Sequence, residues 1–157
     1  MKSLVIPKGY KSNCDPIVNQ KAIKFVRDNF EEVFAKDLNL TRVSAPLLVF
    51  SNTGLNDDLS GVERAVRFDI KELSRDAEIV HSLAKWKRTA LKKYGFTAGS
   101  GLYTDMNAIR RDDKVDNVHS IYVDQWDWEK VITKEDRTTV SAPQSSKTLG
   151  GTLIFSL

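Results

Sequence analysis

The stretch His119-Ser120-Ile121-Tyr122-Val123-Asp124-Gln125-Trp126-Asp127-Trp128-Glu129 decides the fold of this chain. Its residues alternate with a period of two, which is typical of a β-strand whose successive side chains point to opposite faces. The odd-numbered residues share one face, so Gln125 and Asp127 point the same way. The even-numbered residues share the other face, which carries Trp126 and Trp128. We therefore expect a strand with a polar row on one face and aromatic rings on the other.

A second strand is predicted over residues 103–110, and the charged segment 111–117 separates it from the first. Strands joined by a short polar loop are most economically antiparallel neighbours. Shorter strands are expected at 65–70, where apolar and polar residues alternate as in a half-buried strand, and at 78–81.

A long amphipathic helix is predicted upstream. It begins at Asp15-Pro16, where an N-cap acceptor precedes a proline at the first helical position. The apolar residues that recur at three- and four-residue steps are Ile23, Val26, Phe30, Val33 or Phe34, and Leu38. The following residues 40–50 are rich in β-forming types, but Pro46 lacks an N–H group and suggests an edge strand or a break in pairing.

A shorter helix is predicted over 83–94, with Ser82 as its cap and Gly95 at its end. Helices combined with antiparallel strands indicate an α+β domain. From about residue 138 the sequence changes to small polar residues. We therefore expect one domain over 1–138 and a divergent tail over 139–157.

Composition excludes several classes of protein. The net charge of the 157 residues is +3, too small for a nucleic-acid-binding protein, in which Lys and Arg are concentrated on one face. No stretch approaches the roughly 20 apolar residues that span a bilayer, and no signal peptide is expected. The single Cys14 excludes an intramolecular disulfide and favours a cytoplasmic location. Two histidines and one cysteine leave too few ligands for a zinc site, so no metal site is expected in this chain.

Four segments resemble the asparagine synthetase A family, the ammonia-dependent aspartate–ammonia ligases, in their order and spacing. They are 57–61 (DDLSG), 81–88 (HSLAKWKR), 101–106 (GLYTDM) and 119–129 (HSIYVDQWDWE). The second and fourth are long, chemically unusual strings, so their joint occurrence in this order by chance is negligible. The resemblance extends from about residue 19 to residue 131.

The resemblance implies the catalytic fold of class II aminoacyl-tRNA synthetases, an antiparallel sheet flanked by helices that works as a homodimer. The long helix and the strand that follows it are similar to the first motif of that fold, which forms the dimer interface. The strands on either side of 111–117 are similar to the second motif, which holds ATP. Members of the family are longer, and their second half carries the acids that bind Mg²⁺ and a glycine-rich third motif. The fold is therefore expected to be incomplete here.

The resemblance further implies a two-step reaction with ATP and Mg²⁺. The side-chain carboxylate of L-aspartate attacks the α-phosphate of ATP, which gives β-aspartyl-AMP and pyrophosphate, and ammonia then displaces AMP to give L-asparagine. An alternative of a different class is a truncated, non-catalytic module of the same family that dimerises or binds ligand. A nucleic-acid binder is disfavoured, because no anticodon-binding domain is recognisable.

The site residues of the family correspond to positions in this chain. Arg110 matches the second-motif arginine, whose planar guanidinium can bridge the aspartate carboxylate and the α-phosphate. Asp57 matches the loop acid that meets the substrate ammonium, and Lys87 and Ser82 match groups that face a carboxylate. Arg110, Asp57 and Lys87 are the candidate catalytic residues. The remaining matches are Gln125 and Asp127 for aspartate, and Val118, Ser120 and Val123 for the nucleotide.

Each of these residues also has a purely structural explanation. Arg110 beside Arg111 and two aspartates is typical of a solvated charged turn. Trp126 and Trp128 are more often core or edge packing than a stacking platform. Asp57, in a loop rich in Gly and Asn, is typical of turn chemistry. The ordered set of matches, rather than any single residue, supports the functional interpretation.

Overall fold

The computed structural model describes residues 4–57 and 59–136, so the tail expected at 139–157 and its boundary at residue 138 lie outside the described residues. Two helices, six strands and one turn of 3-10 helix are present there, which agrees with the predicted mixture of α and β structure. In chain order they are α1 Pro16–Leu38, β1 Leu40–Arg42, β2 Leu48–Phe50, β3 Arg67–Ile70, η1 Lys71–Leu73, β4 Arg75–Ile79, α2 Ala84–Lys93, β5 Gly101–Ile109 and β6 Tyr122–Lys130.

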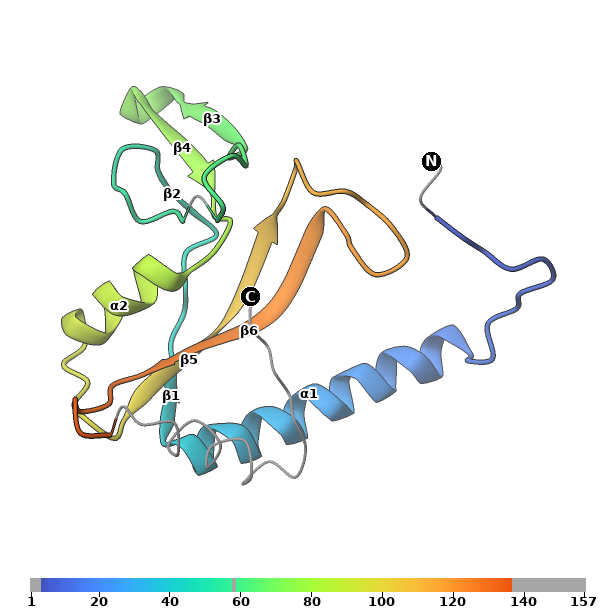
Figure 1. Ribbon diagram of the computed structural model, residues 1–157, viewed down its shortest axis with the longest axis horizontal. Coiled ribbons are helices and arrows are strands. Elements are labelled where there is room, and N and C mark those ends of the chain that lie inside the picture. The colour runs from blue at the N-terminus through green and yellow to red at the C-terminus, as the bar shows by residue number, and fades with distance from the viewer. Residues whose placement is uncertain (1–3, 58, 137–157) are drawn as a thin grey trace.

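The strands form two small sheets (Figure 1). In the first, of order β1-β5-β6, β5 and β6 are antiparallel neighbours, as predicted. Strand β1 runs parallel to β5, so the expectation of a wholly antiparallel sheet is wrong. The reason is topological, because the second sheet and α2 lie between β1 and β5 in the chain, and parallel neighbours require such a long crossover. The second sheet, of order β2-β4-β3, is antiparallel throughout.

Helix α1 begins where the sequence predicts. The Oδ1 atom of Asp15 accepts hydrogen bonds from the backbone amides of Ile17 and Val18 at 2.9 and 3.0 Å, which satisfies two of the amides left unpaired at a helix start. The C-terminal part of the helix packs on the first sheet through the buried Phe34 and Leu38. The N-terminal part extends away from both sheets (Figure 1).

The strands of the second sheet differ from the prediction in their boundaries and burial. The strand expected at 65–70 is β3, which begins at Arg67 and is mostly exposed because it forms an edge of its sheet. The strand expected at 78–81 is β4, which starts earlier and ends at Ile79. Val80 and His81 are buried beyond the end of this strand.

Helix α2 is slightly shorter than predicted. Leu83, rather than Ser82, occupies the N-cap position, and the Ser82 hydroxyl accepts the backbone amide of Ala84 at 3.2 Å. Gly95 follows the helix with a φ of 73°, a conformation that glycine adopts without strain, and it ends the helix as predicted. Pro46 lies between β1 and β2, which belong to different sheets, so the predicted break in pairing is confirmed.

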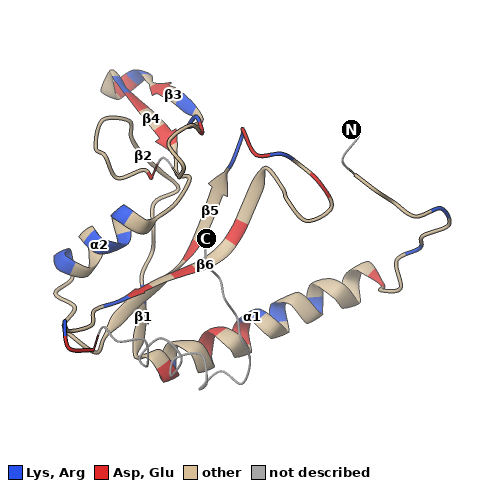
Figure 2. Cartoon of the chain, in the orientation of Figure 1, with Lys and Arg blue, Asp and Glu red and all other residues tan. Residues whose placement is uncertain are grey.

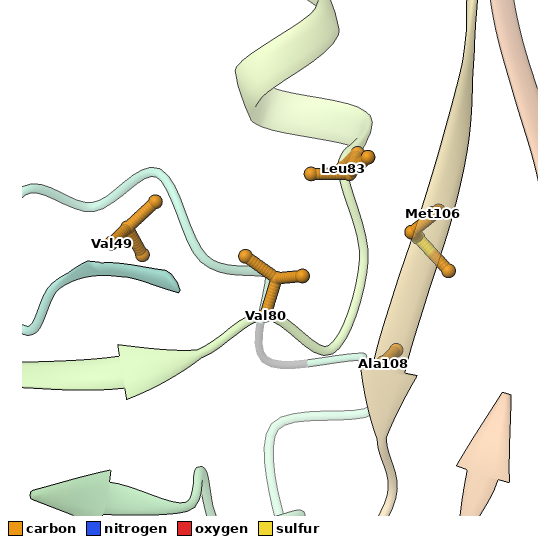
Figure 3. Packing of buried hydrophobic residues seen from close by; sticks show 5 residues of the cluster. All are labelled: Val49, Val80, Leu83, Met106 and Ala108. Atoms are coloured by element: carbon orange, nitrogen blue, oxygen red, sulfur yellow. The ribbon is translucent and has the colours of Figure 1, made fainter. Parts of the chain in front are cut away.

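The first sheet is packed between the two helices. Side chains alternate along β5, so Tyr103 packs with Phe34 of α1, whereas Leu102 packs with Ala90 and Leu91 of α2. A third apolar cluster joins the second sheet, the start of α2 and β5 (Figure 3), and it consists of Val49, Val80, Leu83, Met106 and Ala108. Within the described part of the chain, no helix is long and apolar enough to cross a membrane.

We predict that Gly101→Ala strongly destabilises the first sheet. A Cβ atom at this position would lie 2.3 Å from the backbone oxygen of Glu129 and 2.8 Å from the Cα atom of Lys130, and neither atom can move without disturbing the β5–β6 pairing. Urea denaturation should show a loss of about 3 kcal/mol in the free energy of unfolding. The control Thr41→Ala, at an exposed position of β1, should cost less than about 1 kcal/mol. A Gly101→Ala protein as stable as the wild type would contradict this packing.

Candidate functional site

The two faces of β6 carry different chemistry, as the alternation predicts. The ring of Trp126 stacks on Phe30 of α1 with centroids 5.2 Å apart, and the ring of Trp128 meets Phe34 edge-on at 5.7 Å. The two tryptophans therefore serve packing, which confirms their structural explanation. They anchor β6 on α1 and leave the polar row of the strand facing α2.

Lys87 of α2 is a buried cation on this polar face, with a side chain that is 6% exposed. Its Nζ atom donates to Asp127 and to the backbone carbonyl of Trp128 at 2.9 Å, and it lies 3.4 Å from the carboxylate of Glu129. Two of the three N–H donors of the ammonium group are therefore hydrogen-bonded, and Glu129 adds a second carboxylate nearby. A buried charge is tolerated only when it is paired and hydrogen-bonded. These contacts therefore hold α2 against β6.

Gln125 lies two residues from Asp127 on the same face of β6, as predicted. Its Nε2 atom is 3.9 Å from the sulfur of Met106, the residue opposite it on β5. A thioether is a weak acceptor, and this is the one hydrogen bond that the Gln125 side chain makes within the described residues. Most of the hydrogen-bonding capacity of the carboxamide therefore remains available to a ligand.

Arg110 extends the polar face beyond the end of β5. Its backbone N–H donates to the carbonyl of Ile121 at 2.8 Å, which continues the β5–β6 pairing one residue past Ile109. By alternation, Arg110 shares a face with Met106 and with Gln125 opposite. Its Nε atom is buried and has no hydrogen-bond partner within the described residues. A buried donor left unpaired costs about 1–3 kcal/mol, so this nitrogen does not contribute a hydrogen bond to the stability of the described residues.

The loop between β2 and β3 brings Asp57 against the first turn of α2. The neighbouring Asn56 is buried and donates to a backbone carbonyl of β4 at 3.2 Å, while its Oδ1 atom accepts the backbone amide of His81 at 2.8 Å. The Nζ atom of Lys85 lies 3.7 Å from the carboxylate of Asp57. This loop is thereby fixed to the segment that contains Ser82.

The residues assigned to the nucleotide are dispersed. Val118 is 85% exposed in the connection between β5 and β6, and Ser120 is exposed in the same connection. Val123 packs instead against the apolar cluster that contains Met106 and Ala108. Of these three residues, only Val123 lies on the polar face of β6, whereas Val118 and Ser120 lie in the connection after Arg110.

The predicted aspartate-binding residues form a row rather than a tight cluster. Lys87 and Asp127 are in direct contact, and Gln125 follows on the same face. Arg110 lies four residues beyond Met106, the residue paired with Gln125, and this is about 13 Å along the strand at the rise of an extended chain. A ligand that touches both ends of this row must therefore be elongated.

The structure shows two contacts near the site that the sequence analysis did not predict. Glu129 contacts both Lys87 and Arg88, at 3.4 and 3.6 Å. The alternation could have predicted Glu129, because this residue continues the odd-numbered row of β6. Arg64 pairs with Asp112, just after Arg110, and no local pattern indicates a contact between residues that are 48 positions apart.

On the opposite face of the first sheet, Asp105 of β5 lies between two arginines. It accepts hydrogen bonds from Arg27 of α1 at 2.9 Å and from Arg42 of β1 at 2.7 Å, and Arg27 also reaches Asp124 of β6 at 2.9 Å. Partial burial alone would raise the pKa of Asp105, but the hydrogen bonds from Arg42 and Arg27 hold that pKa below its usual value. Figure 2 shows acidic residues on β6, and these pair with Arg27 of α1 on one face of the sheet and with Lys87 of α2 on the other.

Residues 17–149 match the family model of aspartate–ammonia ligase. The chain belongs to this family. The aspartate–ammonia ligase of Ruminiclostridium cellulolyticum is 63% identical over 139 residues, which cover 88% of this chain and 41% of the relative. That of Clostridium perfringens strain 13 is 58% identical over 153 residues, covering 97% and 46%. That of Lactiplantibacillus plantarum is 57% identical over 136 residues, covering 86% and 42%.

The family match confirms the resemblance read from the four sequence segments and extends past residue 131, where that resemblance was expected to end. Every residue predicted for the site lies within the matched range. The chain spans less than half the length of these aspartate–ammonia ligases.

We predict that Lys87→Met destabilises the protein, because it leaves Asp127 and Glu129 without their shared cation. Removing one member of a buried ion pair costs about 3–5 kcal/mol, and we expect the lower end here because both carboxylates keep some contact with water. Urea denaturation at pH 7 measures the loss. Lys24→Met is the matched control, since Lys24 is 77% exposed and its surface pair with Asp28 should contribute less than about 1 kcal/mol. Equal losses in the two variants would show that Lys87 has no special structural role.

Proposed function

We propose that the polar face of β5, β6 and α2 belongs to an enzyme that amidates L-aspartate with ammonia, at the expense of ATP. The family match supports the reaction class. The observation that carries the assignment to this face is the buried, unpartnered Nε atom of Arg110 on the same strand face as Gln125 and Asp127. An enzyme that brings together two anions needs a cation that no carboxylate of the protein has already neutralised.

The proposed reaction has two steps. An oxygen of the aspartate side-chain carboxylate bonds to the α-phosphorus of ATP while the bond to pyrophosphate breaks. Ammonia then attacks the carbonyl carbon of β-aspartyl-AMP, loses a proton, and AMP leaves with the electron pair of the broken bond. Arg110 bridges the carboxylate and the α-phosphate in the first step, because its planar guanidinium donates to two oxygens at once. Holding the two reactants in line supplies much of the acceleration.

We assign the recognition of aspartate to five further residues. Asp57 meets the substrate ammonium, while Lys87 and Ser82 face a substrate carboxylate. Two donors of Lys87 are hydrogen-bonded within the protein, so we propose that the substrate carboxylate takes the third and replaces the 3.4 Å approach to Glu129. Gln125 and Asp127 complete the polar row and orient the substrate between Lys87 and Arg110.

For the nucleotide we propose Arg110, Val118, Ser120 and Val123. The side chain of Arg110 makes no hydrogen bond or ion pair within the described residues, which supports a role toward a phosphate, and the exposed position of Ser120 suits a contact with bound nucleotide. The described residues fit Mg²⁺ less well, since they contain no group of three or more His, Cys, Asp or Glu side chains that could hold a metal ion. We therefore assign no step on this face to Mg²⁺.

The fold and assembly that we propose are those of a class II aminoacyl-tRNA synthetase-like domain that acts in the cytoplasm as a homodimer. A sheet covered by a helix on each face supports this assignment. A dimer formed through α1 is supported by large apolar side chains on its N-terminal part that are 61–67% exposed, namely Ile17, Val18, Phe25 and Val26.

A non-catalytic module that dimerises or binds ligand is the second candidate. One observation favours it, namely that α1 carries exposed apolar residues, which could form a dimer without any catalysed reaction. The two candidates share the same fold and the same dimer, and they differ in whether the chain turns over substrate.

The test of catalysis is release of pyrophosphate from ATP that depends on both aspartate and ammonia. We expect Arg110→Ala to reduce this rate by about 100-fold or more, because it removes a preorganised charge from the reacting centre. Arg111→Ala, one residue away in the same connection, is the matched control and should retain the rate within about twofold. If the wild-type chain releases no pyrophosphate but binds aspartate in calorimetry, the non-catalytic module is correct.

The test of assembly is sedimentation of the free chain at micromolar concentration. We expect a dimer, and we expect Phe25→Glu to yield monomers because it places a charge among the exposed apolar residues of α1. Lys21→Gln, one turn earlier on the same helix, should leave the dimer intact. A wild-type chain that sediments as a monomer would refute this interface.

A further inference from the structure

A forked ion pair joins the connection after Arg110 to the segment before β3. Asp112 accepts three hydrogen bonds from Arg64, two at Oδ2 and one at Oδ1. They come from the backbone N–H at 2.8 Å, from Nε at 3.0 Å and from Nη2 at 2.5 Å. Two parallel bonds between a guanidinium and a carboxylate are stronger and more directional than a single contact. Both oxygens of Asp112 are therefore committed to Arg64.

Arg64 itself is anchored at its backbone. Its carbonyl oxygen lies 3.2 Å from Nε2 of His81, and because a carbonyl can only accept, this ring nitrogen carries the hydrogen. His81 is 1% exposed, and its backbone amide donates to the buried Asn56, the neighbour of Asp57. The buried residues His81 and Asn56 therefore hold both Arg64 and the loop that carries Asp57.

Unlike Arg64, Arg110 has a side-chain donor without a partner in the described part of the chain. It precedes Asp112 by two residues, and the connection turns there, with the backbone amide of Asp113 donating to the carbonyl of Arg110 at 3.3 Å. The Arg110 Nε atom has no partner among the described residues, although a carboxylate lies so near in the chain. Hydrogen bonds from Arg64 hold the pKa of Asp112 well below its usual value, so this carboxylate is charged at neutral pH. A charged Asp112 released from Arg64 would be a free carboxylate two residues from Arg110 and next to Arg111 in the chain.

We propose that Arg64 is a positioning residue that holds Asp112 away from Arg110 and thereby keeps the Arg110 guanidinium free for a nucleotide phosphate. This inference rests on the proposed function, since it assigns a purpose to the freedom of Arg110. In this proposal Arg64 acts through its hydrogen bonds to Asp112. The Arg64–Asp112 pair also restrains the connection that follows Arg110. The same contact therefore restrains the backbone next to Arg110 and keeps Asp112 from neutralising it.

The first test follows the Nε–H resonance of Arg110 in the ¹⁵N-labelled chain by nuclear magnetic resonance. In Arg64→Met the released Asp112 should pair with Arg110, and the Nε–H proton should move downfield. The double variant Arg64→Met with Asp112→Asn should return the resonance to its wild-type position, a rescue that a merely structural role would not produce. Arg111→Met removes a charge from the same connection without breaking a hydrogen bond to Asp112, and it should leave the resonance unchanged. An unaltered Arg110 resonance in Arg64→Met overturns the proposal.

The second test measures ATP binding by calorimetry. Arg64→Met should weaken binding on the order of tenfold, the worth of a hydrogen bond to a charged group, and the double variant should recover most of that loss. A shifted Arg110 resonance with unchanged ATP affinity would overturn the positioning role. If Arg110→Ala binds ATP as the wild type does, or if the wild type does not bind it, the proposed function fails instead, while the resonance experiment still decides whether Arg64 restrains Asp112.

Discussion

The antiparallel pairing of β5 with β6 is the constraint on which the rest of this structure depends. Its register runs from Gly101 opposite Lys130 to Ile109 opposite Tyr122. Because side chains alternate strictly along a strand, this register decides which residues face α1 and which face α2. A slip of one residue in β6 would turn Trp126 toward α2 and Asp127 toward α1. The same register is therefore required both for the polar face of β6 and for the packing of Trp126 and Trp128 on α1.

The two helices are held to this pair of strands by different kinds of interaction. Helix α1 is attached by apolar packing of Phe34 and Leu38, by ring stacking on Trp126 and by the partly exposed Arg27–Asp105 ion pair. Helix α2 is attached by apolar packing on Leu102 and by the buried ammonium of Lys87. A buried ion pair demands good geometry, since any displacement leaves a charge without compensation. The face that carries the candidate site is thus the more sharply defined of the two.

The sequence predicts the strongly periodic parts of this fold and misses the pairings that depend on distant residues. The long helix from Asp15 and the two faces of β6 are read correctly, because period and capping are local properties. The parallel pairing of β1 is missed, since a strand of three residues shows no alternation and its partner lies some sixty residues away. For the site, alternation alone places Gln125 and Asp127 together and would have added Glu129. The roles given to Arg110 and Asp57 come from the family resemblance, because a charged turn and a polar loop look alike whether or not they bind a substrate.

Lys87 and Arg110 show how the same face can serve stability at one end and chemistry at the other. The ammonium of Lys87 is hydrogen-bonded to Asp127 and Trp128 and lies near Glu129, so it contributes to the fold before any ligand arrives. The guanidinium of Arg110 keeps a buried Nε without a partner, which lowers the stability of the free chain. Such a donor gains its hydrogen bond only when an anion binds, so the energy withheld from folding becomes available to binding. Neutralisation by a neighbouring carboxylate would remove that gain, and the engagement of Asp112 by Arg64 is the contact within the described residues that prevents it.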